Sequence, residues 1–241
     1  MFGLGTVINT AAVLAGGLVG HLAGKLFRQE QQEAICKACG VSTLFIAVAG
    51  AMEGMLKIEN GALASAHAML VVLCLTLGTV IGELIRIERH FEHFGEWLKR
   101  RTGNSRDTGF VHAFVTASLT VCIGAMAIVG AIQDGIRGDY TMLAVKSVLD
   151  FIIIAVMTTS MGKGCVFSAI PILVLEGGVT LLASLVAPLM TDLAVADLSL
   201  IGSVLIFCVG VNLVWGKQIR VANMLPAVLL AIAAAYLPFG F

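Results

Sequence analysis

Charged residues are scarce in this chain, and neither sign of charge is in excess. Lys, Arg, Asp and Glu make up 12% of the 241 residues, hydrophobic types make up 59%, and the mean hydropathy is +0.99. Because a soluble globular chain is about a quarter charged, this composition excludes an ordinary water-soluble domain. The 15 basic residues only balance the 15 acidic ones, which leaves no positive excess to neutralise the phosphates of a nucleic acid. We therefore expect an integral membrane protein whose main partner is the lipid bilayer.

The sequence also lacks the short motifs of common catalytic sites. It contains no nucleophile elbow, phosphate-binding loop, HExxH helix or dinucleotide fingerprint. The one close cysteine pair, Cys36 and Cys39, has no second pair or nearby histidine to complete a zinc site. We predict no cofactor, no metal centre and a non-enzymatic role. An intramembrane enzyme stays open as an alternative.

Long apolar runs fill the chain from end to end. Because a membrane-spanning helix needs about 20 mostly apolar residues, the sequence predicts eight spans. They lie near residues 3–25, 34–56, 62–85, 110–133, 141–162, 165–190, 198–216 and 221–240. We expect an all-α fold, a polytopic bundle of transmembrane helices that forms a single domain. Pro171 and the pair Gly177-Gly178 interrupt the sixth run, which predicts a broken sixth helix.

The distribution of positive charge predicts the orientation of the spans. With the N-terminus outside, the odd-numbered connections face the cytoplasm and hold most of the 15 basic residues. These are Lys25, Arg28, Lys37, Arg86, Arg89, Lys99, Arg100, Arg101, Arg106, Lys163, Lys217 and Arg220. Positive residues concentrate on the cytoplasmic side, so we expect an inner-membrane protein with both termini outside. The first apolar run has its basic residues after it, which favours a retained helix over a cleaved leader.

The longest polar stretch contains one amphipathic helix, predicted over residues 84–103. Its apolar positions recur at steps of three and four and share one helical face. They are Leu84, Ile87, Phe91, Phe94 and Leu98. Two interpretations remain open: the helix rests at the cytoplasmic membrane interface, or it docks a partner. The second interpretation would make the protein a membrane scaffold or sensor.

Glycines four residues apart give two spans a smooth face. Gly16, Gly20 and Gly24 lie in the first span, and Gly78 and Gly82 lie in the third. Such faces let helix backbones approach closely, either within one bundle or between the copies of a homo-oligomer. The pattern does not choose between these two roles.

Three spans share a sequence pattern, which in the fourth span is the closing stretch Ala127-Ile-Val-Gly130-Ala131. Residues 43–50 of the second span and 203–210 of the seventh are both apolar stretches that open with a hydroxyl residue and end with glycine. On the predicted topology these two spans run in opposite directions, as an inverted repeat requires. Internal repeats are a common plan of transporters, but apolar helices also resemble one another by chance. Both explanations remain open.

Ionisable side chains inside the spans define the candidate site. At a rise of 1.5 Å per residue, Asp150 lies roughly 13 Å into the fifth span and Glu176 roughly 16 Å into the sixth, both near the middle of the bilayer. Lys146 precedes Asp150 by one helical turn and can pair with it. The pair either only holds helices together, or releases one partner to a solute or a proton.

Seven short motifs occur in order along nearly the whole chain. They are Gly5-Thr-Val-Ile-Asn9, Gly82-Glu-Leu-Ile-Arg-Ile-Glu88, Phe114-Val-Thr-Ala-Ser118, Cys122-Ile-Gly-Ala-Met-Ala127, Gln133-Asp-Gly135 with Gly138-Asp139, Lys146-Ser-Val-Leu-Asp150 and Val221-Ala-Asn-Met-Leu-Pro226. Together they resemble the YqgA/YdfK family of bacterial membrane proteins, a domain of unknown function. The resemblance implies a bacterial inner-membrane protein with no assigned substrate. Lys146 and Asp150 match the family's motif, whereas at Glu176 the family pattern has Gln, so a proton-carrying Glu176 would not be general to it.

The leading hypothesis is a transporter of a small solute or ion with a polar site near the middle of the membrane. Lys146 and Asp150 form the core of this predicted site. Glu176, Gln133, Asp134 and Asn212 are predicted to contribute to it. The alternatives are a non-transporting scaffold or sensor that works through the helix at 84–103, and an intramembrane enzyme.

Overall fold

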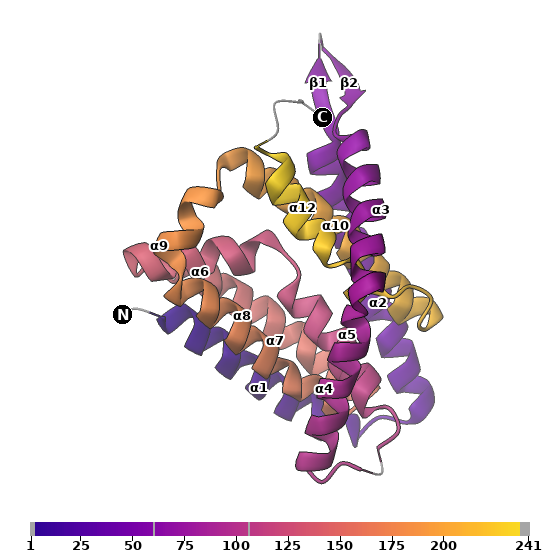
Figure 1. The fold of residues 1–241 in the computed structure, drawn as a ribbon. Helices are drawn as coiled ribbons and strands as arrows, with labels where there is room; N and C mark the ends of the chain where they lie inside the picture. The colour runs from indigo at the N-terminus through magenta and orange to yellow at the C-terminus, as the bar shows by residue number, and fades with distance from the viewer. Residues whose placement is uncertain (1–2, 60, 106, 237–241) are drawn as a thin grey trace.

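Helices make up almost all of the computed structural model, which describes residues 3–59, 61–105 and 107–236 (Figure 1). In chain order the elements are α1 (Leu4–Gly24), α2 (Gln29–Met55), β1 (Leu56–Glu59), β2 (Ala62–Ser65), α3 (Ala68–Ile85), α4 (Ile87–Arg101), α5 (Phe110–Cys122), α6 (Ala125–Arg137), α7 (Thr141–Met161), the 3-10 helix η1 (Lys163–Ser168), α8 (Ala169–Leu181), α9 (Ala183–Val186), the 3-10 helix η2 (Ala187–Leu189), α10 (Asp192–Trp215), α11 (Val221–Met224) and α12 (Pro226–Ala234). The predicted all-α bundle is confirmed. One small addition is the antiparallel pair β1 and β2, in which Leu56 is opposite Ser65, so the third span begins at Ala68 rather than at residue 62.

Six of the eight predicted spans correspond to helices of membrane-spanning length and composition. Within the described residues, six helices are long and apolar enough to cross a membrane, or seven if α5 and α6 count as one bent span. The eighth predicted span corresponds to the shorter apolar helices α11 and α12, and its residues 237–241 lie outside the described part of the chain. On α1 the side chains of Val7, Leu18 and Leu22 are 60%, 61% and 63% exposed. Such apolar outer faces are suited to lipid rather than to water.

The sharpest break in a span lies at Gly124, between α5 and α6, which are inclined by 61°. Gly124 has φ +145° and ψ 149°, a conformation that is nearly restricted to glycine. The sixth segment is not broken at the predicted positions, because Lys163–Leu181 form one candidate membrane span. Pro171 lies in the first turn of α8, where its missing N–H is tolerated, and the helix continues through Gly177 and Gly178 to Leu181. The interruption follows Leu181, where α9 and η2 replace a continuous helix.

The long helices pack in pairs. α1 lies along α7 in a parallel orientation, whereas α2 with α10 and α3 with α12 form antiparallel pairs. The fourth and sixth segments form a further parallel pair, through α5 with η1 and α6 with α8. Whether the resemblance of residues 43–50 to residues 203–210 reflects an inverted repeat stays a prediction.

Both smooth glycine faces are used inside the chain. A Cβ atom at Gly16 would overlap the carbonyl of Phe151, and one at Gly20 would overlap the carbonyl of Ala155. Gly82 packs in the same way against the carbonyl of Asn223. These contacts place the glycine faces within one bundle, which corrects the option that they join two copies of the chain.

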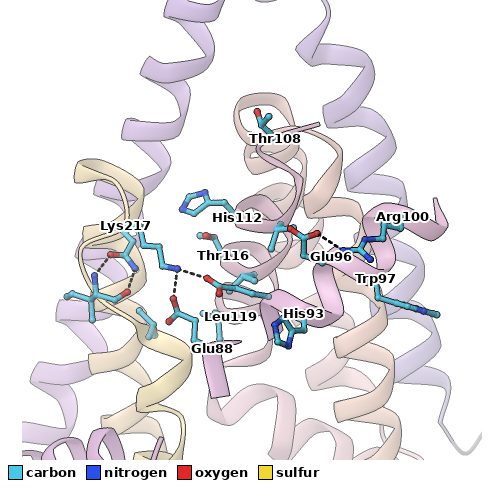
Figure 2. Close-up of a pocket in the computed structure, with 16 residues that line it drawn as sticks. Glu88, His93, Glu96, Trp97, Arg100, Thr108, His112, Thr116, Leu119 and Lys217 are labelled. Carbon is cyan, nitrogen blue, oxygen red and sulfur yellow. Dashed lines mark hydrogen bonds and ion pairs between the residues drawn. The ribbon is translucent and has the colours of Figure 1, made fainter. Parts of the chain in front are cut away.

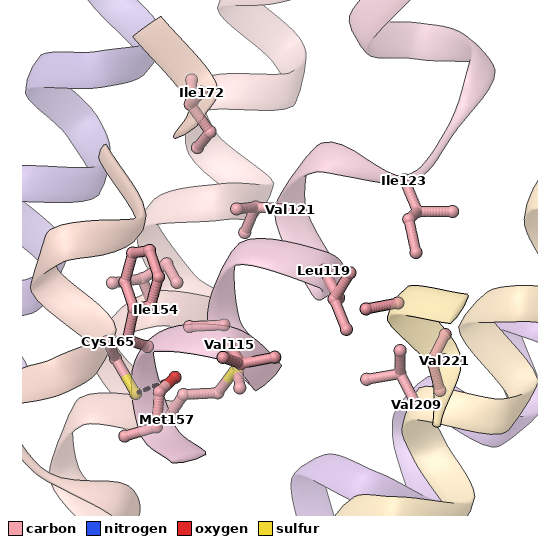
Figure 3. Close-up of a cluster of buried hydrophobic side chains, with 14 of the residues drawn as sticks. Val115, Leu119, Val121, Ile123, Ile154, Met157, Cys165, Ile172, Val209 and Val221 are labelled. Atoms are coloured by element: carbon pink, nitrogen blue, oxygen red, sulfur yellow. Dashed lines mark hydrogen bonds between the residues drawn. The ribbon is translucent and has the colours of Figure 1, made fainter. Parts of the chain in front are cut away.

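The main hydrophobic core surrounds α5 (Figure 3). This helix is buried from Ala113 to Val121. Figure 3 shows side chains of α7, η1, α8, α10 and α11 around it, among them Ile154, Cys165, Ile172, Val209 and Val221. The core fixes the position of α5, so that its C-terminal end lies in the interior of the bundle, next to the candidate site.

Candidate functional site

Four polar side chains from three helices meet in the interior of the bundle. Lys146 Nζ of α7 contacts Asp150 Oδ2 and lies 3.5 Å from Glu176 Oε1 of α8. Asn9 Nδ2 of α1 donates hydrogen bonds to Asp150 Oδ2 at 3.0 Å and to Glu176 Oε1 at 2.8 Å. All four residues are buried, and Asn9 and Glu176 are 0% exposed. We call Asn9, Lys146, Asp150 and Glu176 the buried cluster.

The helix break at Gly124 supplies a fifth polar group. Lys146 Nζ donates a hydrogen bond to the carbonyl oxygen of Val121 at 2.8 Å. In an uninterrupted helix this carbonyl would accept the N–H four residues later, but the break ends α5 at Cys122 and leaves it free. The end of α5 also carries the negative pole of the helix dipole, which favours a cation. The broken fourth span is therefore part of the site.

The charges of the buried cluster do not balance. Two carboxyl groups and one ammonium leave one negative charge in excess when all three are ionised. Glu176 Oε2 and Asn9 Oδ1 are buried and have no hydrogen-bond partner among the described residues. Because buried polar atoms are normally partnered, these two oxygens are candidates for binding a proton or a cation. One such charge would make the cluster neutral.

The cluster lies where the first and sixth segments meet. Besides the contact between Asn9 and Glu176, Thr6 Oγ1 of α1 lies 3.3 Å from Thr180 Oγ1 of α8. These two contacts join the two segments. All side chains and the carbonyl of the site come from the first, fourth, fifth and sixth segments.

The other predicted site residues lie elsewhere. Asp134 is fully buried on α6, and its Oδ2 accepts the backbone N–H of Gly5 at 2.8 Å, so it caps the N-terminus of α1. Gln133 is half-buried on α6. Asn212 Oδ1 accepts the N–H of Gln218 at 2.8 Å and of Ile219 at 2.9 Å, which fixes the connection between α10 and α11. The structure thus brings together Lys146, Asp150 and Glu176 but not the remaining three.

The sequence did carry a signal for Asn9, which was not among the predicted site residues. Spans one and five are predicted to run in the same direction, and Asn9 lies roughly 9 Å into its span, close to the depth of Asp150. Similar depth in parallel helices points to a contact. The carbonyl of Val121 had no comparable signal, because a single glycine such as Gly124 is common in apolar helices.

A large cavity lies between α4, α5 and the α10–α11 connection (Figure 2). Its volume is about 780 Å³, and its polar lining consists of Glu88, Glu92, His93, Glu96, Arg100, Thr108, His112, Thr116, Asn212 and Lys217. Lys217 Nζ lies 2.6 Å from Glu88 Oε1 and 2.7 Å from Glu92 Oε1. Partial burial by itself lowers the pKa of Lys217, but the hydrogen bonds to Glu88 and Glu92 outweigh it and raise the pKa above its ordinary value.

The predicted amphipathic helix corresponds to α4, and its apolar face packs on α5. Leu98 is buried, and the ring centroid of Phe94 lies 5.8 Å from that of Phe114. Arg86, at φ +59°, separates α4 from α3. Within the described residues no group of three or more His, Cys, Asp or Glu side chains is suited to hold a metal ion.

Comparison with known proteins identifies relatives that match nearly the whole chain. "Uncharacterized membrane protein YdfK" of Bacillus subtilis (strain 168) is 25% identical over 237 residues, which cover 98% of this chain and 97% of the relative. "Uncharacterized protein YqgA" of Escherichia coli (strain K12) is 29% identical over 233 residues, which cover 95% and 94%. No solved structure matches the chain. The predicted resemblance is confirmed, because residues 4–236 match the family model "Protein of unknown function (DUF554)", and this multi-pass membrane protein belongs to the DUF554 family.

Proposed function

We propose that this protein is a transporter, rather than an enzyme, and that it moves a small solute or ion across the bacterial inner membrane. The buried cluster is its binding site. The observation that carries the proposal is the set of three ionisable side chains, Lys146, Asp150 and Glu176, in contact inside a bundle of membrane helices. Charges at this depth are costly, and uncharged polar side chains such as Ser or Asn could hold the helices together at lower cost. Retaining the charges therefore favours a role in binding.

The position of the cluster supports the same proposal. Many secondary transporters bind their substrate near the middle of the membrane, between two inverted repeats and beside a discontinuous helix. Here the cluster lies at the contact of the first and sixth segments and beside the break at Gly124. This support is an analogy of architecture, and the charges supply the chemical argument.

We place the end of the bundle that carries α4 and the α10–α11 connection in the cytoplasm, with both termini outside. The support is the concentration of Lys and Arg in the connections at that end. Arg220 and Lys217 pair there with Glu83 and Glu92. In this orientation α5 runs inward from the cytoplasmic side to the buried cluster.

The geometry suggests how binding acts on the protein. A cation or proton that reaches Asp150 and Glu176 competes with Lys146 for the same oxygens. Displacement of Lys146 also breaks its hydrogen bond to Val121, which holds the end of α5 against α7. Occupation of the site is thereby linked to the position of the α5 end, and Gly124 is the hinge between α5 and α6.

The experiment that tests the proposal is a flux assay on purified protein in liposomes, run against a panel of metabolites and inorganic ions. Asp150→Asn removes one charge with little change in shape, and we expect it to reduce flux roughly tenfold or more. Asp139→Asn is the matched control, because Asp139 is an exposed carboxylate in the α6–α7 connection. Undiminished flux through Asp150→Ala at normal expression would contradict the proposal.

A second candidate function is a scaffold or sensor that acts through α4. It is favoured by the exposed polar face of this helix, where Trp97 is 52% exposed beside the acidic residues of the cavity. In that case exchanging the exposed charges of α4 abolishes the cellular function, whereas Asp150→Asn has no effect. The transporter proposal predicts that Asp150→Asn is the more damaging change.

A further inference from the structure

The large cavity extends along one side of α5 toward the buried cluster. Its lining residues on this helix are Val111, His112, Val115, Thr116 and Leu119. They recur at helical spacing and so form one stripe, which covers roughly 12 Å along the helix axis at 1.5 Å per residue. The cavity therefore follows α5 inward from the end where α4 lies.

The inner end of this stripe is close to the site. Leu119 precedes Val121 by two residues, and the carbonyl of Val121 accepts the hydrogen bond from Lys146. Less than one helical turn of α5 separates the innermost lining residue on this helix from a group that contacts the buried cluster. The unpartnered oxygens Glu176 Oε2 and Asn9 Oδ1 lie in that cluster.

The α4 side of the cavity carries acidic groups that suit a cation. Glu88, Glu92 and Glu96 follow one another at intervals of four on the same face of α4, and Figure 2 shows Glu88 and Glu96 labelled in the lining, with Lys217 opposite. The ammonium of Lys217 is held between two of these carboxylates and shows that the position accepts a cation. Three glutamates against Lys217 and Arg100 leave a negative excess. Trp97, also in the lining, adds an aromatic surface that attracts cations.

We propose that this cavity is a cytoplasmic vestibule through which a small positively charged solute reaches the buried cluster. The inference rests on the transporter function proposed above and names the substrate class: a cation, which supplies the positive charge that the cluster lacks. Lys217 is a tethered cation inside the cavity, and an arriving solute exchanges with it on Glu88 and Glu92.

Thiol labelling of the full-length protein in inside-out membrane vesicles tests the path. Thr116→Cys puts a thiol in the cavity lining, and His112→Cys puts one nearer the mouth, where the side chain is exposed. Ser118→Cys is the matched control, because Ser118 is on the same helix, is 1% exposed and is not part of the lining. A cationic trimethylammonium-ethyl and an anionic sulfonato-ethyl methanethiosulfonate are applied. Peptide mass mapping distinguishes labelling of the new thiol from labelling of the six native cysteines. Each labelling rate is divided by the rate at which the same reagent reacts with free cysteine.

We expect both lining thiols to react, and the normalised rate at Thr116→Cys to be about threefold or more higher with the cationic reagent, since the net negative charge of the lining attracts cations. Glu92→Gln should reduce this preference. Glu83→Gln should not, because Glu83 pairs with Arg220 outside the lining. Ser118→Cys should stay unmodified.

Three results would overturn the inference. The first is a normalised rate at Thr116→Cys that is equal for the two reagents or higher for the anionic one. The second is no labelling of Thr116→Cys when His112→Cys is labelled, and the third is labelling of Ser118→Cys as fast as that of Thr116→Cys. The labelling requires no transport, so the two proposals fail separately. Cation-selective labelling without flux in liposomes would support the vestibule and contradict the transporter function. Flux without labelling would support the transporter function and contradict the vestibule.

Discussion

The ammonium of Lys146 donates a hydrogen bond to the carbonyl oxygen of Val121 over 2.8 Å, and this contact joins the intact helix α7 to the broken end of α5. The same ammonium contacts Asp150 and lies 3.5 Å from Glu176. One side chain thus links the carboxylates of the site to the backbone at the broken end of α5. The following predictions test the parts of this arrangement one at a time.

The break at Gly124 depends on a backbone conformation that other residues rarely adopt. Gly124→Ala should destabilise the protein by about 1–3 kcal/mol, the usual cost of such strain, although an added Cβ would meet nothing within 4 Å. Gly178→Ala is the control, because Gly178 also has open space but lies within α8, where Ala is favoured by about 0.5–1 kcal/mol. Thermal unfolding in detergent measures both. Equal effects of the two changes would contradict the conformational explanation.

The ion pair of Lys146 and Asp150 should be strongly coupled in stability. Lys146→Met leaves two buried carboxyl groups without their cation and should cost about 3–5 kcal/mol. Combining it with Asp150→Asn should cost less than the sum of the single changes, by about 1–3 kcal/mol.

The exposed pair of Lys57 and Glu59, 2.7 Å apart, is the control for this cycle. Its coupling should stay below about 1 kcal/mol, because water screens exposed pairs. Both cycles are measured by reversible unfolding in mixed micelles. Simple additivity at Lys146 and Asp150 would mean that the contact contributes nothing to the fold.

Asp134 should affect stability and not transport. Its carboxylate caps α1 through the N–H of Gly5, so Asp134→Ala should destabilise the protein by about 0.5–2 kcal/mol. Asp134→Asn keeps an acceptor oxygen and should cost less. Flux per folded molecule should match that of the native chain in both variants. A loss of flux in folded Asp134→Asn would show that Asp134 takes part in binding, as the sequence predicted.

The close packing of α1 on α7 should tolerate no added carbon at Gly20. A Cβ there meets the backbone carbonyl of Ala155, which cannot move aside as a side chain can, so Gly20→Ala should cost about 1–3 kcal/mol. At Gly177 the nearest atom to an added Cβ is Thr6 Cγ2 at 3.8 Å, an ordinary contact. Gly177→Ala should therefore leave the unfolding temperature unchanged or raise it. The reverse order would show that α1 does not lie on α7 through this face.

Much of the fold could be predicted from the sequence, because hydropathy determines which segments enter a membrane. The pairing of Lys146 with Asp150 follows from their spacing on one helix. The contact of Glu176 with that pair is consistent with the predicted depth of Glu176 in the sixth span, near the middle of the bilayer. Helix ends were less predictable, and residues 62–65 form a strand where a span was expected.

The site itself could be predicted only in part, for two physical reasons. The break falls at Gly124 and not at Gly177. A glycine interrupts a helix only where tertiary contacts stabilise the interrupted conformation. Here the freed carbonyl of Val121 binds Lys146. The contacts of Lys217 with Glu88 and Glu92 join residues distant in the sequence, so no local pattern could reveal them.

The most direct test of the central claim is the uptake of each solute and ion of the panel into liposomes that carry oriented, purified protein. Each is added outside in turn, to the native chain, Asp150→Asn and Asp139→Asn. The account predicts uptake of at least one of them by the native chain and by Asp139→Asn that is absent in Asp150→Asn. The same uptake by Asp150→Asn, or none of any solute by folded protein, would contradict it.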